Sequence, residues 1–72
     1  MINASDVQRA AKQVIRDHGS AAAETAARWA IVLRSANYVE LAQTWERIAI
    51  AVRALEAERQ APGRLTRFLR FG

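Results

Sequence analysis

Residues 29–45 read W-A-I-V-L-R-S-A-N-Y-V-E-L-A-Q-T-W, two apolar segments that carry a tryptophan at each outer end and an asparagine at the centre. Asn37 tolerates the left-handed conformation that ends a helix, and N-Y-V-E has the N-x-x-E form of a capping box. One residue is therefore expected to close a helix and to open the next. Such a short connection predicts an antiparallel helical hairpin with Asn37 at its tip.

Residues at equal distances from Asn37 should meet across this hairpin. Trp29 and Trp45 are each eight positions from it, and this symmetry predicts a tryptophan pair at the centre of the core. Nearer the turn, Leu33 should meet Leu41. Further from it, large residues of the later helix face alanines of the earlier one, and the expected pairs are Ala26 with Ile48 and Ala22 with Val52.

A third helix precedes the hairpin. Ser5-Asp6-Val7-Gln8 has the S-x-x-Q form of a capping box, and apolar residues follow at helical spacing as far as Ile15. His18-Gly19 predicts its end, and Ser20 is expected to cap the helix that follows. Val7, Val14 and Ile15 should close over the tryptophans.

The predicted fold is all-α, a small three-helix bundle with helices over about 6–18, 20–36 and 38–60. Pro62-Gly63 is expected to end the last helix, which divides the chain into a bundle over residues 1–61 and a basic amphipathic tail over 62–72. A chain of 72 residues is one domain at most, and it buries only about 60% of its unfolded surface. Stability must come from helix packing, since the sequence contains no cysteine for a disulfide.

The chemistry that an enzyme needs is sparse. The sequence has one histidine, His18, at a predicted helix end, and its three glycines lie at 19, 63 and 72, where they form no phosphate-binding loop. One histidine and scattered carboxylates do not make a metal site. We expect a non-enzymatic protein with no catalytic residues, no metal and no cofactor.

A protein partner, or a second copy of the chain, is the interpretation we favour. Ile31 and Ile50 lie opposite the tryptophan stripe of their own helices, and Ala54 extends the stripe of Ile50. The tail adds a second apolar side if it is helical. The predicted partner-binding residues are Ile31, Ile50, Ala54, Leu65, Phe68 and Leu69.

Two alternatives use the positive charge, which amounts to a net +4. Accessory nucleic-acid binding would use basic residues spaced by three and four on the first helix together with the arginines of the tail. These residues are Arg9, Lys12, Arg16, Arg64, Arg67 and Arg70. The other alternative is a weak contact of the tail with an anionic membrane surface.

The first residues do not show the basic segment followed by an apolar segment that is typical of a secretory signal. We therefore expect a cytoplasmic protein.

The span from D-H-G-S-A-A-A-E-T-A-A-R to L-A-Q-T-W-E-R-I-A-I-A-V-R-A-L-E resembles a family of short, uncharacterised bacterial proteins. The shared pattern is H-G, an alanine-rich helix, a brief turn and a helix with W-x-x-I, and it covers residues 17–56. Those proteins have a glycine and an acid in the turn where this chain has Ser35-Ala36-Asn37-Tyr38. The resemblance implies a helical fold and carries over no functional residue.

Overall fold

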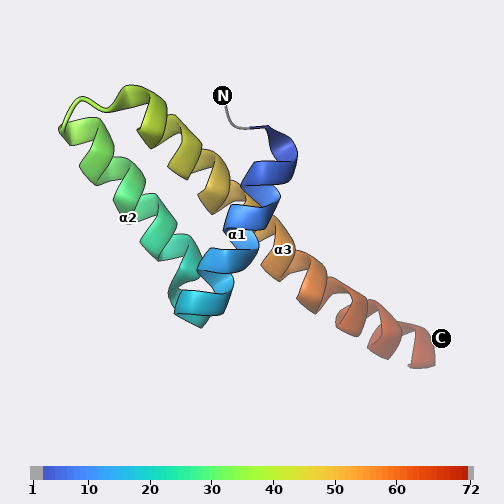
Figure 1. Cartoon of the computed structure of the whole chain (residues 1–72). Helices are drawn as coiled ribbons and strands as arrows, with labels where there is room; N and C mark the ends of the chain where they lie inside the picture. Colours follow the sequence, from blue (N-terminus) through green and yellow to red (C-terminus); the bar gives the residue numbers. More distant parts are fainter. Residues whose placement is uncertain (1–2, 72) are drawn as a thin grey trace.

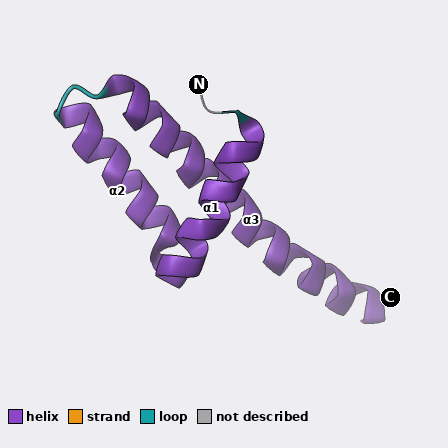
Figure 2. Cartoon of the chain, viewed as in Figure 1, coloured by secondary structure: helices purple, strands orange, loops and turns teal. Residues whose placement is uncertain are grey.

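The computed structural model describes the backbone of residues 3–71 and the side chains of residues 3–59. It contains helix α1 (Ala4–His18), a 3₁₀ turn η1 (Gly19–Ala21), helix α2 (Ala22–Ser35) and helix α3 (Val39–Phe71). Helices and short connections account for the described part of the chain (Figures 1 and 2). The all-α prediction is confirmed.

Helix α1 begins two residues earlier than its predicted start. Asn3 is the N-cap: its side-chain oxygen accepts the backbone N–H of Asp6 at 2.9 Å, and the Asp6 carboxylate accepts the N–H of Asn3 at 3.5 Å. The predicted capping box at Ser5 and Gln8 is therefore wrong in position, although the motif is of the expected kind. A carboxylate binds a backbone N–H and the helix N-terminus more strongly than the neutral amide of Gln8 does.

Gly19 ends α1 and turns the chain toward α2. Its φ of 56° and ψ of −127° are accessible to glycine and costly for other residues. The expected role of Gly19 is confirmed, but the helix that follows does not start at Ser20. Residues 19–21 form the 3₁₀ turn, and α2 starts at Ala22 without a side-chain cap.

Asn37 makes the turn between α2 and α3, as predicted. Its φ is 71°, and the surrounding hydrogen bonds run from the N–H of Tyr38 to Leu33 O at 2.8 Å and from the N–H of Asn37 to Arg34 O at 3.0 Å. This pair of bonds is a Schellman motif. The predicted capping box of Asn37 with Glu40 is wrong, because α3 starts at Val39 and Tyr38 O accepts its first N–H, from Ala42.

Helix α3 continues through Pro62-Gly63 to Phe71, so its predicted end near residue 60 is wrong. Helix formers flank the two residues on both sides, and extending an existing helix avoids the cost of nucleating a new one after a break. At about 1.5 Å per residue the helix is roughly 50 Å long. It sets the 52 Å long dimension of the molecule, and its C-terminal end projects beyond the other helices (Figure 1).

The core lies where α1 crosses the α2/α3 hairpin (Figure 1). Val7, Ala11 and Val14 of α1 pack there in one cluster with buried residues of both hairpin helices. The predicted pairs Ala26 with Ile48 and Ala22 with Val52 are all buried in this cluster. The hairpin tip extends beyond α1, and this geometry leaves the tip uncovered.

Candidate partner-binding surface

Alanine is the commonest residue of the core, and many large apolar side chains lie outside it. Among the side chains of residues 3–59, seven of the eleven buried hydrophobic residues are alanine, and the largest fully buried one is Val52. All large hydrophobic residues that the structure shows as exposed fall on α2, α3 and the turn between them. They are Trp29, Ile31, Val32, Tyr38, Val39, Leu41 and Ile50.

The first exposed apolar surface lies on the outer side of the hairpin. Ile31 of α2 and Ile50 of α3 are each 66% exposed, and they line one shallow hollow with Ala27, Ala30 and Ala49. We call this the isoleucine surface. The structure therefore brings two of the predicted partner-binding residues together, from helices that the sequence places 19 positions apart.

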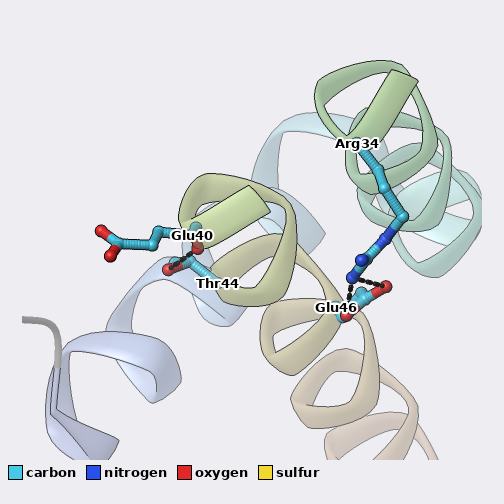
Figure 3. A network of polar contacts seen from close by, with 4 residues as sticks. All are labelled: Arg34, Glu40, Thr44 and Glu46. Carbon is cyan, nitrogen blue, oxygen red and sulfur yellow. Dashed lines mark hydrogen bonds and ion pairs between the residues drawn. The ribbon is translucent and has the colours of Figure 1, made fainter. Parts of the chain in front are cut away.

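An ion pair spans the two helices beside the isoleucine surface. The Arg34 Nη2 atom donates to both carboxylate oxygens of Glu46, each at 2.9 Å (Figure 3). Both side chains are about half exposed, so the pair contributes little to the stability of the fold. Arg53 lines the hollow as well, and its charge is not paired among the described side chains.

The second exposed apolar surface is the tryptophan surface, formed by Trp29 and Val32, which line one hollow on α2. The ring centroids of Trp29 and Trp45 lie 6.3 Å apart with an interplanar angle of 30°, so the predicted pair exists. Its predicted place at the centre of the core is wrong. Trp29 is 50% exposed and Leu41 is 52% exposed, whereas Trp45 is partly buried against the core.

The length of α1 explains why the tryptophan pair lies outside the core. With 15 residues, α1 spans roughly 22 Å. Val7 and Val14 cover the level of Ile48 and Val52 instead of the tryptophans, and Ile15 packs at the edge of the same cluster. Val39 is exposed, as expected from its place on the stripe of Ile50, but the exposure of Val32, Tyr38 and Leu41 was not predicted. The short first helix was the signal that could have identified them.

The remaining predicted partner-binding residues divide into two groups. Ala54 is exposed on α3, as expected for its stripe. Leu65, Phe68 and Leu69 belong to the part of α3 whose side chains lie outside the described residues, and the prediction for them stays untested.

The basic residues predicted for nucleic-acid binding are described only on α1. Arg9, Lys12 and Arg16 are exposed, and no ion pair holds them among residues 3–59. The first two line a shallow surface depression near the start of α1. Arg64, Arg67 and Arg70 lie in the C-terminal part of α3, which runs away from α1 in Figure 1.

His18 is exposed at the end of α1, and the hollow between that end and α3 is lined by Ser20, Glu56 and Arg59. Within the described side chains no three histidine, aspartate or glutamate residues gather around a potential metal position. Over the same part of the chain, no helix combines the length and apolarity required to cross a bilayer.

No family model, no curated protein and no solved structure matches this chain. The function is therefore inferred from the geometry and the charge of this chain alone.

Proposed function

We propose that the protein is a non-enzymatic, cytoplasmic interaction module that buries the exposed side of its α2/α3 hairpin against a protein. The three-helix bundle expected from the sequence is the framework of this proposal. One observation carries it: seven large apolar side chains are exposed, whereas most of the buried side chains are alanine. Because burying a large aliphatic side chain contributes about 1.5–3 kcal/mol, covering even two of them makes a substantial difference to a chain of this size.

The isoleucine surface is the part of the hairpin that best fits a partner. Ile31 and Ile50 flank a floor of alanines, a shape into which the ridge of another helix fits. The Arg34–Glu46 ion pair joins the two helices beside it. A surface that is already shaped loses less entropy when a partner binds.

Retention on the immobilised protein tests this proposal. The unmodified chain is immobilised and exposed to native cytosol or to free copies of itself. The proteins that it retains are then eluted and identified. Ile50→Glu places a charge in the apolar contact and should abolish retention. Gln8→Glu is the matched control, because it adds the same charge at an exposed position of α1 and should retain as much as the unmodified chain. Equal retention by the Ile50→Glu protein would refute the proposal.

Accessory nucleic-acid binding is the second candidate, and it follows from the unpaired, exposed basic residues of α1. Phosphate binding weakens steeply between low and physiological salt, whereas an apolar contact does not. Replacing Arg9, Lys12 and Arg16 together with alanine should abolish retention of nucleic acid at low salt. If retention is unchanged, these residues do not carry it. A contact of the tail with anionic membranes remains a third, weaker expectation.

A further inference from the structure

We propose that the partner of the hairpin is a second copy of this chain, and that two α3 helices pair antiparallel along their outer stripe. This inference rests on the proposed function, and it adds the identity and the orientation of the partner. The α3 outer stripe consists of Val39, Ile50, Ala54 and Ala57. All four are exposed, Ile50 at 66% and Val39 at 41%.

The stripe lies on the side of α3 that the rest of the molecule leaves free. Residues of α3 that pack against α1 and α2 include Ile48, Ala49 and Val52. At 100° per residue, the stripe residues lie within about 40° of Ile50, and the buried residues lie about 100° or more from it. A second helix can therefore pack on the stripe without displacing α1 or α2.

The continuity of α3 aligns its outer stripe with the C-terminal segment of the same helix. Phe68 follows Ile50 by 18 positions, which is five turns of an α-helix. The helix thus places position 68 on the same side as the stripe. A break at Pro62-Gly63 would have removed this alignment.

Charge selects the antiparallel orientation. Residues 39–47 contain Glu40, Glu46 and Arg47, a net charge of −1, whereas residues 63–71 contain three arginines and no acid, a net charge of +3. A parallel pair would place +3 beside +3. An antiparallel pair avoids this repulsion and places each basic end beside the acidic end of the other copy.

The register follows from the bounds of the helix. Val39–Phe71 has its midpoint at residue 55, and two helices that overlap fully about this point bring residue n opposite residue 110 − n. Glu46 then faces position 64, an arginine, once on each side of the two-fold axis. Ala54 and Ala57 fall near the axis, where small side chains allow helix axes to approach to about 8 Å.

Engineered cysteines test both the second copy and the orientation, because the natural chain has none. Ala54 lies one position from the midpoint, so its two copies are separated by about 3 Å along the axis, within reach of a disulfide. The two copies of Gln43 are separated by roughly 36 Å. Under mild oxidation Ala54→Cys should give a covalent dimer that reducing agent reverses, and Gln43→Cys should remain a single chain.

Each other outcome of the cysteine experiment contradicts the proposal. Cross-linking of both variants would show a parallel pair. Cross-linking of neither, with helicity by circular dichroism unchanged, would show that α3 does not pair in this register. If neither cross-links and Ile50→Glu still abolishes retention of another protein, the interaction module stands and its partner is a different molecule.

Charge reversal tests the register independently. Glu46→Arg and Arg64→Glu should each increase the dissociation constant of the dimer at least tenfold, and the double variant should restore most of the lost affinity. Arg34→Gln is the control for the internal ion pair that Glu46→Arg also breaks, and it should leave the dimer intact. Failure of the double variant to recover would contradict the predicted pairing of positions 46 and 64.

Discussion

Trp29 exposes half of its surface, while Ala26, on the same helix, exposes none. The difference arises from where α1 crosses the hairpin, since the core cluster contains Ala26 but not Trp29. An alanine that is fully covered by a neighbouring helix leaves no room for a larger residue. Close packing at these alanines, rather than the size of the buried side chains, holds the helices together.

Overpacking at Ala26 should therefore destabilise the protein. Ala26→Leu inserts three carbon atoms into a site without exposed surface, and we expect a loss of about 1–3 kcal/mol in the free energy of unfolding. Thermal or urea unfolding followed by circular dichroism measures it. Ile31→Leu is a suitable control because Ile31 is exposed, and it should change stability by less than about 0.5 kcal/mol. Equal stability of Ala26→Leu and the unmodified chain would contradict a tightly packed core.

Gly19 should be sensitive to substitution because of its backbone conformation. An added Cβ would contact nothing within 4 Å, but the φ of 56° is strained for any residue with a side chain. Gly19→Ala should cost about 1–2 kcal/mol of unfolding free energy, measured by the same urea titration. Ser20→Ala, an exposed neighbour in the same turn, is expected to behave like the unmodified chain. If Gly19→Ala has the same free energy of unfolding as the unmodified chain, the turn does not have the positive φ described here.

At the scale of elements, the sequence predicted which segments are helical and missed how far two of them extend. Asn37 and Gly19 were identifiable because a positive φ restricts the choice of residue. The start of α1 was misplaced because two overlapping capping boxes are present and only the energetic balance between Asp6 and Gln8 decides. The end of α3 was misplaced because the local preference of Pro62 opposes the cooperativity of a long helix.

Pro62 should make the C-terminal part of α3 its least stable region. A proline inside a helix costs about 3 kcal/mol relative to alanine, since it removes one N–H donor and crowds the preceding turn. Pro62→Ala should slow amide hydrogen exchange of residues 63–71 and increase the helicity measured by circular dichroism. Exchange of the core helices α1 and α2 should not change. A variant with unaltered exchange over residues 63–71 would contradict a helix that continues through Pro62.

At the scale of the whole molecule, the candidate site was predictable only in part. The helical period placed Ile31 and Ile50 outside the core, but their meeting in one hollow depends on the crossing of α2 and α3. The exposure of Trp29 and Leu41 depends on the reach of α1, which a pattern within one helix does not contain. The sequence thus reveals faces of helices, and the tertiary arrangement decides which faces remain uncovered.

The mass of the protein in solution tests the central claim, which is that a second copy covers the exposed side of the hairpin. Sedimentation equilibrium of the unmodified chain at physiological salt should approach twice 8.0 kDa as concentration rises. Ile50→Glu should sediment at 8.0 kDa over the same range, with unchanged helicity. An unmodified chain that stays at 8.0 kDa at every concentration would contradict the claim.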